Sequence, residues 1–245
     1  MTYFKTQAAL YAEYRPDYPA ELFEFVAANA PARRLAWDCA CGNGQAAVGL
    51  AEHFGRVIAT DASPEQISHA RPHQRIEYRV AAAESSGLPS ASVDAITVTQ
   101  ALHWLDLEKF YAEVRRVLVP KGTLTVTVYT DAMMDDPKLS AIFQHYNKQI
   151  VGPYWPAERQ IVNEEYRSVP FPFEKIPAPP LTLERQWRLA ELAGYLRSWS
   201  ATVRYVKANG SDPVVEFERA MAEHWGDPQK PKNIRWPFIV ISGHI

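Results

Sequence analysis

Over the first 130 residues, segments whose hydrophobic pattern is typical of a β-strand alternate with segments whose pattern is typical of an α-helix. Short apolar or alternating runs predict five strands, at 35–37, 56–61, 75–83, 93–100 and 123–129, and the run at 93–100 is rich in β-branched residues. Between them, apolar residues recur every three or four positions. This spacing predicts helices over 21–27, 46–54 and 106–119, and Ser63-Pro64 predicts the start of a further one. Strands that alternate with helices in this way predict an α/β fold with a parallel sheet and right-handed crossovers.

After residue 130 the pattern changes. A helix is expected over 137–151, and the stretch 152–180 then combines seven prolines with five aromatic residues. Because disordered segments are poor in aromatic residues, we expect this stretch to be ordered and to form part of a lid. The remaining elements that the pattern predicts are a strand at 181–187, helices at 189–199 and 214–225, and a final strand at 234–241.

The first predicted strand leads into a turn that is typical of nucleotide-binding proteins. Gly42 and Gly44 would let the backbone approach a ligand, and the helix that follows would offer free N–H groups. Asp61 ends the next strand, where a carboxylate would face a ribose. The spacing also satisfies the G-x-G-x-x-G/A pattern of NAD and FAD sites, and a turn that binds no ligand is a further reading of the glycines alone.

Asp38 favours one cofactor over the others. A carboxylate four residues before Gly42 is badly placed beside a pyrophosphate and well placed to accept a hydrogen bond from an ammonium group. S-adenosylmethionine has an amino-acid end, an adenosine end and no phosphate, so it fits the turn better than NAD. An NAD-dependent oxidoreductase and a protein that binds the cofactor without catalysis remain the alternatives.

The composition of the chain argues against nucleic acids, membranes and metal ions as binding partners. The 245 residues carry a net charge of −2, which argues against a nucleic-acid binder, and no apolar run is long enough to span a membrane. The start lacks the apolar core of a signal peptide, so we expect a cytoplasmic protein, a monomer or homodimer, that acts on a small molecule. Cys39 and Cys41 have no companions that would complete a zinc set, so we expect no metal and two reduced, buried thiols.

A set of short motifs carries a family resemblance. The motifs are, in chain order, Phe4-x-x-x-Ala8-x-x-Tyr11, Arg15-Pro16-x-Tyr18-Pro19, Asp38-x-Ala40-Cys41-Gly42-Asn43-Gly44, Asp61-Ala62-Ser63, Ala83-Glu84, Leu88-Pro89, Ser92-Val93-Asp94, Gln100-Ala101-x-His103-Trp104 and Arg116-Val117-Leu118-x-Pro120-x-Gly122. In order and spacing this set resembles the class I S-adenosylmethionine-dependent methyltransferases. More narrowly, it is similar to the small-molecule branch that includes trans-aconitate methyltransferase-like proteins, as are residues 152–155 and 195–200.

The resemblance implies a Rossmann-like methyltransferase fold. It has a mostly parallel seven-stranded sheet with helices on both faces, an N-terminal cap, and a lid insertion after the fifth strand. A single domain over 1–245 would then comprise the cap (1–30), the cofactor-binding core (31–130), the substrate lid (131–180) and the C-terminal completion of the sheet (181–245). The implied reaction is methyl transfer to a small organic molecule, on an oxygen, with a carboxylate among the acceptors.

The resemblance also implies roles for individual residues. Asp38 and the backbone at Ala40 and Gly42 would hold the methionine ammonium, and Asp61 would accept both ribose hydroxyls. The other expected cofactor contacts are Tyr11, Arg15, Gly44, Ala62, Gln66, Ala83, Glu84, Gln100 and His103. The expected contacts to the methyl acceptor are Tyr14, Trp104, Tyr129, Tyr154 and Trp155.

Two departures from the family pattern bear on these roles. Ala40 stands where a glycine is usual, so we expect a negative φ there. Ala82 replaces a frequent acid, which leaves recognition of the adenine N6 to backbone groups or to Glu84. His103 is the candidate general base because imidazole titrates near neutral pH, and it serves equally well as a wall of the pocket. Since positioning at an activated sulfonium can supply much of the rate, we assign no catalytic residue.

Overall fold

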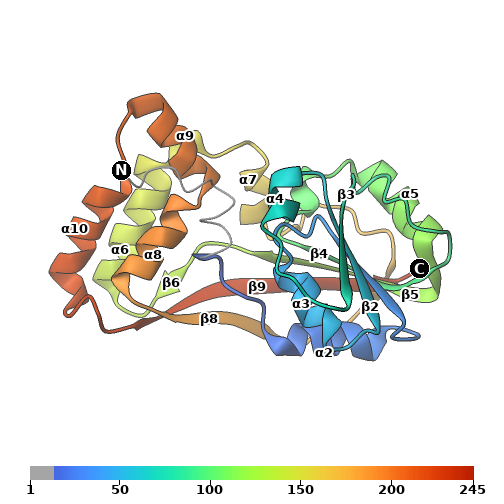
Figure 1. Ribbon diagram of the computed structural model, residues 1–245. Helices are drawn as coiled ribbons and strands as arrows, with labels where there is room; N and C mark the ends of the chain where they lie inside the picture. Colours follow the sequence, from blue (N-terminus) through green and yellow to red (C-terminus); the bar gives the residue numbers. More distant parts are fainter. Residues whose placement is uncertain (1–13) are drawn as a thin grey trace. The chain divides into compact units, whose positions relative to one another are not determined.

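The computed structural model describes residues 14–245, which form two compact units (Figure 1). The first unit holds the chain up to Pro16, Asp131–Arg159 and Leu183–Pro237. The second holds Asp17–Thr130, Gln160–Thr182 and Phe238–Ile245. The segments 131–180 and 181–245, expected as lid and as completion of the sheet, are therefore each divided between the two units. The expected contact of Tyr11 lies outside the described residues.

The second unit is built on parallel strands in the order β3-β2-β1-β4-β5. These strands are β1 (Leu35–Cys39), β2 (Arg56–Asp61), β3 (Ile76–Val80), β4 (Val93–Thr99) and β5 (Leu118–Tyr129). The order reverses direction between β1 and β4, so the loops after these strands diverge and leave room for a ligand at their C-terminal ends. The Rossmann-like, mostly parallel fold expected from the sequence is confirmed.

A long antiparallel strand, β9 (Lys232–His244), extends the sheet beyond β5. Tyr129 lies opposite Phe238, and β7 (Glu174–Ile176) pairs with β9 as well. Toward its start β9 pairs with β6 (Met133–Met134), and β8 (Leu181–Trp187) is a further partner. In residues 14–245 the sheet thus has nine strands, where seven were expected, because β6, β7 and β8 all pair with β9.

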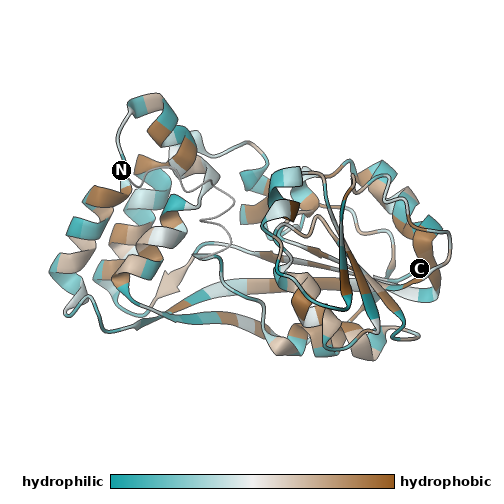
Figure 2. Ribbon diagram, viewed as in Figure 1, coloured by the Kyte–Doolittle hydropathy of each residue, from teal (hydrophilic) through white to brown (hydrophobic). Residues whose placement is uncertain are grey.

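The helices of the second unit follow the apolar spacing of the sequence. Its helical segments are α2 (Ala20–Asn29), α3 (Gln45–Ala51), α4 (Pro64–Ser68), η1 (Leu102–Trp104) and α5 (Leu107–Val117), and α7 (Arg159–Asn163) begins at its boundary. In α5 the Asp106 side chain accepts a hydrogen bond from the backbone N–H of Lys109, which caps the first turn. Figure 2 shows hydrophobic residues along one side of α5 and hydrophilic ones along the other, and Phe110, Val114 and Val117 are fully buried. The connection from β3 to β4 has no α-helix.

The core of the second unit lies around Trp37, which is fully buried in β1. Its indole N–H donates to Thr60 Oγ1 over 2.9 Å, and its ring meets Phe110 of α5 edge-on. At the opposite end of the strands, the buried carboxylate of Asp94 accepts the backbone N–H groups of Arg34 and Leu35. Burial raises the pKa of Asp94, but hydrogen bonds from Arg34 and these two amides outweigh it and hold the pKa below its usual range.

The first unit is mainly helical. Its helices are α6 (Pro137–His145), the π-helical turn η2 (Tyr146–Ile150), η3 (Gly152–Tyr154), α8 (Leu189–Arg197), α9 (Ser200–Asn209) and α10 (Val214–Trp225). Trp199 packs against Phe143, Tyr146 and Tyr195 in its core. The helix expected over 137–151 thus ends as an α-helix at His145, and α9 was not predicted because only Ala201 and Thr202 of it are buried.

Two expectations on buried chemistry and on membranes can be checked against the described residues. Cys39 and Cys41 are free and buried, as expected, and burial raises the pKa of both thiols above the usual range. From residue 14 onward, none of the helices combines the length and the apolar character that a bilayer span requires.

Candidate active site

The turn after β1 is held in an uncommon backbone conformation. Ala40, Gly42 and Gly44 have φ angles of +53°, +55° and +84°, so three alternate residues are left-handed. The negative φ expected at Ala40 is therefore wrong. The turn is too tight for an extended residue there, because the Cys41 N–H must reach the Thr60 carbonyl at 2.9 Å while the Gly44 N–H folds back onto the Cys41 carbonyl. A left-handed alanine costs about 1 kcal/mol, which these contacts offset.

Asp38 lies beneath this turn, at the position in β1 that is opposite Ala59 of β2 and Thr97 of β4. Its side chain is fully buried, and Oδ1 accepts from the Thr97 hydroxyl over 2.9 Å. Oδ2 is buried too and has no hydrogen-bond partner within residues 14–245. Burial raises the pKa of Asp38 to about 7, against the lowering effect of hydrogen bonds from Thr97 and from the Ala47 amide. A buried carboxylate oxygen without a partner is the group that a ligand ammonium would satisfy.

Asp61 is oriented by the turns on both sides of it. At the end of β2, its Oδ2 accepts the Gly42 N–H at 2.9 Å and its Oδ1 accepts the Ser63 N–H at 2.8 Å. Each carboxylate oxygen keeps a further lone pair, so the group can still accept two hydroxyls of a ribose. The carboxylate and the glycine turn are thus fixed to each other before any ligand arrives.

Gln66 also faces the glycine turn. Ser63 caps α4 by accepting the Gln66 N–H, which sets the position of the first helical turn. The side-chain Oε1 of Gln66 is buried, has no hydrogen-bond partner in the described part of the chain, and lies 3.9 Å from where a Cβ on Gly42 would be. Ala62 is exposed beside Asp61, as a residue that stacks on a base would be. We therefore count Gln66 among the polar groups that the fold brings to this turn.

The loops after β3 and β4 supply the remaining predicted cofactor contacts. Glu84 accepts the backbone N–H of Asp106 at 3.0 Å and so joins the two loops, and Ala83 is buried next to it. Gln100 has a left-handed φ of +57°, and its side-chain amide makes two hydrogen bonds to the backbone of Tyr129 in β5. Parallel strands in the order β3-β2-β1-β4 bring all these loops to one edge of the sheet.

His103, in η1, has a partner that the sequence did not reveal. Its Nδ1 lies 2.7 Å from the hydroxyl of Tyr166, and the two rings are 5.9 Å apart. Tyr166 is fully buried although it comes from the proline-rich stretch, 63 residues away. No spacing or motif in 152–180 indicates that this tyrosine returns to the end of β4. Trp104, the neighbour of His103, is 55% exposed.

Four predicted site residues, Tyr14, Arg15, Tyr154 and Trp155, lie in the first unit, and each contacts another residue of that unit. Tyr14 lies so close to Gly194 that a Cβ there would be 2.6 Å from the tyrosine ring. Arg15 lies over the ring of Tyr195.

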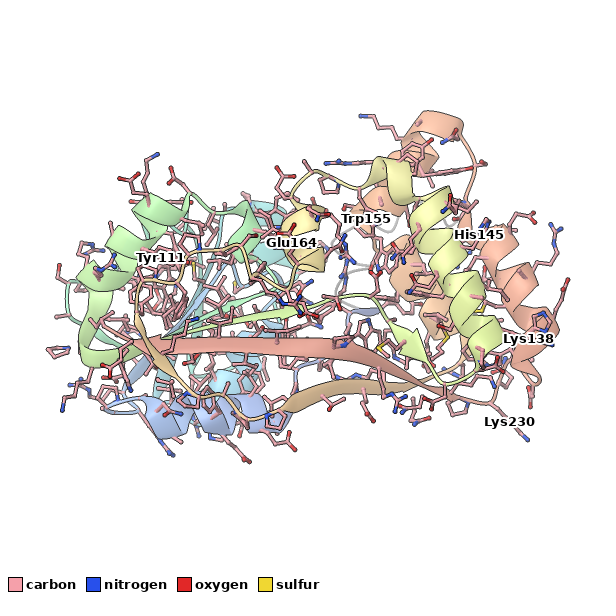
Figure 3. The ribbon with its side chains drawn as sticks, turned by 180° about the vertical axis from the view of Figure 1, so that it is seen from behind. Tyr111, Lys138, His145, Trp155, Glu164 and Lys230 are labelled. Carbon is pink, nitrogen blue, oxygen red and sulfur yellow. The ribbon has the colours of Figure 1, made fainter. Side chains whose placement is uncertain are left out.

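The other two are Tyr154 and Trp155. The Tyr154 hydroxyl accepts from Asn209, and the Trp155 indole N–H, labelled in Figure 3, donates to Asn147. Tyr129 is buried in the second unit. The roles of these residues toward cofactor and acceptor stay predictions.

Comparisons with known proteins agree with this geometry. The family model described as a methyltransferase domain matches residues 37–126, which include the glycine turn and both aspartates. A protein named as a methyltransferase in Dictyostelium discoideum is 34% identical over 238 residues, which are 94% of this chain and 90% of that protein. A Saccharomyces cerevisiae protein named as an S-adenosylmethionine-dependent methyltransferase is 27% identical over 94% of this chain and 92% of its own length.

A solved structure supports the same assignment over nearly the whole chain. A structure described as that of a type II methyltransferase from Anaeromyxobacter dehalogenans superimposes with a TM-score of 0.87 at 42% sequence identity, and covers 94% of this chain and 98% of that one. These matches leave the NAD-dependent alternative without support. The chain belongs to the class I S-adenosylmethionine-dependent methyltransferases.

Proposed function

We propose that this methyltransferase transfers the methyl group to an oxygen of a small organic molecule, and that the acceptor class is a carboxylate. The observation that supports the cofactor-binding part of the proposal is the polar edge of the sheet, where the unpartnered Asp38 oxygen and the Asp61 carboxylate lie on either side of the glycine turn. The carboxylate acceptor is supported by the resemblance to the trans-aconitate branch. The net charge of −2 does not favour a nucleic-acid acceptor.

The residues at this edge suit the two ends of the cofactor. Asp38 would hold the methionine ammonium, since a charged partner satisfies its buried oxygen, and Asp61 would hold the ribose hydroxyls. Gln66, Glu84 and the backbone at Gln100 would complete the surroundings. S-adenosylmethionine supplies a methyl group that is already activated by the positive sulfur.

A carboxylate acceptor places few demands on the protein. It is ionised at neutral pH, so it can attack the methyl carbon without first losing a proton to a base. The protein then contributes by holding the two reactants in line and by excluding water.

The test is a panel of acceptors with purified protein and S-adenosylmethionine. Aliphatic mono-, di- and tricarboxylic acids are compared with alcohols, phenols, amines and thiols, and S-adenosylhomocysteine and the methylated product are followed by mass spectrometry. We expect methyl esters, which mild alkali cleaves to release methanol. Turnover confined to amines or thiols, or an ether product that resists alkali, would contradict the proposal. Asp61→Ala serves as the control for cofactor-dependent turnover.

A further inference from the structure

The backbone after α7 has an uncommon conformation that directs the Tyr166 hydroxyl toward His103. After α7 the chain turns through Glu165 and Tyr166, whose φ angles of +56° and +59° are both left-handed. Two successive non-glycine residues in this region are unusual, and glycine is the residue that avoids the strain. The Tyr166 N–H is fixed by the Ile161 carbonyl at 3.1 Å, and Glu164 marks the segment in Figure 3. The result is a buried tyrosine whose hydroxyl meets His103.

Counting the donors and acceptors around the Tyr166 hydroxyl shows which partner donates in its hydrogen bond with His103. A phenol has one proton to donate and an oxygen that can accept. Burial raises the pKa of Tyr166, against the lowering effect of the backbone at His103 and Leu102, so the phenol keeps its proton. Tyr166 is 1% exposed, so this proton needs an acceptor inside the protein. In the described part of the chain, the acceptor in reach is Nδ1 of His103, at 2.7 Å.

The opposite assignment leaves a buried donor unsatisfied. If Nδ1 carried the proton and donated to Tyr166, the phenolic O–H would have no acceptor within residues 14–245. A neutral imidazole has one N–H and one bare nitrogen, so a hydrogen bond accepted at Nδ1 fixes the proton at Nε2.

We propose that Tyr166 is a positioning residue that holds neutral His103 as the Nε2–H tautomer, so that His103 acts on the methyl acceptor as a hydrogen-bond donor and not as a general base. This inference deepens the proposed function and rests on it for the identity of the reaction. It assigns a role to a residue in the proline-rich stretch that no motif pointed to.

The Nε2–H tautomer of His103 favours a carboxylate over an alcohol as the methyl acceptor. A donor at Nε2 can bind one oxygen of a carboxylate while the other oxygen attacks the methyl carbon. The new bond is O–CH3, the bond that breaks is S–CH3, and its electron pair goes to sulfur, which becomes a neutral thioether. No proton moves, so the step balances without a base. An alcohol would have to give up a proton, and Nε2 already holds one, so alcohols are selected against.

The tautomer can be observed directly, without cofactor or acceptor. Two-bond proton–nitrogen NMR on protein labelled at histidine distinguishes the protonated from the bare ring nitrogen. The spectrum is taken at about pH 8.5, two units above the ordinary histidine pKa of about 6.5, and His103→Gln assigns the signal by its loss. We expect a bare Nδ1 and a protonated Nε2 in the wild-type protein, and a mixture of tautomers in Tyr166→Phe. A protonated Nδ1 in the wild-type protein would overturn the proposal.

Tyr111→Phe is the matched control. The Tyr111 hydroxyl, also labelled in Figure 3, donates to the Pro170 carbonyl at 2.7 Å and belongs to the same core cluster as Tyr166. It anchors the same segment without a hydrogen bond to His103. This variant should therefore leave the His103 tautomer unchanged, and a tautomer that shifts equally in both variants would show that general loosening, not the Tyr166 hydroxyl, sets it.

Kinetics supply a second readout. His103→Gln keeps a side-chain N–H donor but can take no proton, whereas His103→Leu has neither ability. On a carboxylate we expect His103→Leu to lose about 10- to 100-fold in kcat/KM and His103→Gln to recover most of that loss. Equal losses in both variants would contradict the donor role. Failure to methylate any carboxylate, with the Nε2–H tautomer observed, would refute the proposed function and leave the positioning by Tyr166 intact.

Discussion

Asp38 should make the free energy of unfolding depend on pH in a direction that is unusual for an aspartate. Burial raises its pKa from 3.8 to about 7 in the folded chain. Between these two values the folded protein holds a proton that the unfolded chain has released. The free energy of unfolding therefore falls as the pH rises through this window, and the contribution is fully present only below the unfolded pKa.

The size of the effect follows from the two pKa values. Full ionisation across the window corresponds to about 4 kcal/mol, at about 1.4 kcal/mol for each pKa unit. Between about pH 5 and about pH 8, the part of the window that is convenient to measure, we expect Asp38 to remove about 2–3 kcal/mol. Asp38→Asn cannot ionise but keeps an oxygen for the Thr97 hydroxyl, so the variant should lack this part of the slope.

The assay is urea denaturation of wild-type and Asp38→Asn protein at several pH values in this range, without cofactor. The quantity of interest is the difference between the two slopes, since other titrating groups are common to both proteins. Asp94→Asn is the matched control, because Asp94 is equally buried but its pKa is lowered, so it stays ionised across this range in both states. Parallel slopes for wild-type and Asp38→Asn protein would refute the argument that burial controls the ionisation of Asp38.

Three further substitutions test other parts of the structure. Asp61→Ala should weaken binding of S-adenosylhomocysteine by about 2 kcal/mol, measured by calorimetry, because two hydroxyl acceptors and the support of the Gly42 N–H are lost; unchanged affinity would remove Asp61 from the cofactor site. Gly44→Ala should lower the free energy of unfolding by about 1–3 kcal/mol, because its Cβ would lie 2.2 Å from the Tyr78 hydroxyl at a left-handed φ. Tyr78→Phe in the Gly44→Ala background should recover part of this loss in urea denaturation, and no recovery would show that the contact with the Tyr78 hydroxyl is not its main cause. Arg197→Leu should cost about 1–2 kcal/mol, because Arg197 bridges Asp212 and Glu218 in the first unit; a loss that high salt does not alter would argue against an ionic origin.

The sequence predicts the second unit well because its signals are local. Each parallel strand was predicted from a short apolar run, and the cap at Ser63, which the sequence predicts, is present in the structure. The first unit was less predictable. Its helix α9 buries little more than Ala201 and Thr202, so it has no clear apolar face, and the short strands beside β9 are defined by their pairing and not by their own sequence.

The same distinction applies to the site. Asp38, Gly42, Gly44 and Asp61 occupy positions that a strand–turn–helix pattern reveals, so they could be predicted from spacing alone. Tyr166 could not, because its contact with His103 spans 63 residues and depends on how the proline-rich stretch folds back. The left-handed Ala40 was mispredicted for a related reason: conformational preference favours a negative φ, and only the pairing of Cys41 with Thr60 overrides it.

Among the left-handed non-glycine residues of the described chain, Ala40, Gln100 and Tyr166 belong to the candidate site, and Ala91, Lys121 and Glu165 do not. Each of the first three is held by a hydrogen bond to a distant segment. Ala40 is held through its neighbour Cys41 on Thr60, Gln100 through its amide on Tyr129, and Tyr166 through its hydroxyl on His103. A strained residue persists only where such contacts fix it more strongly than the local preference opposes it. On the roles proposed above, relaxing any of the three would move a carboxylate, a carbonyl or an imidazole that contacts the cofactor or the acceptor, so we infer for these three positions that the strain is kept because it fixes the site before the ligands bind.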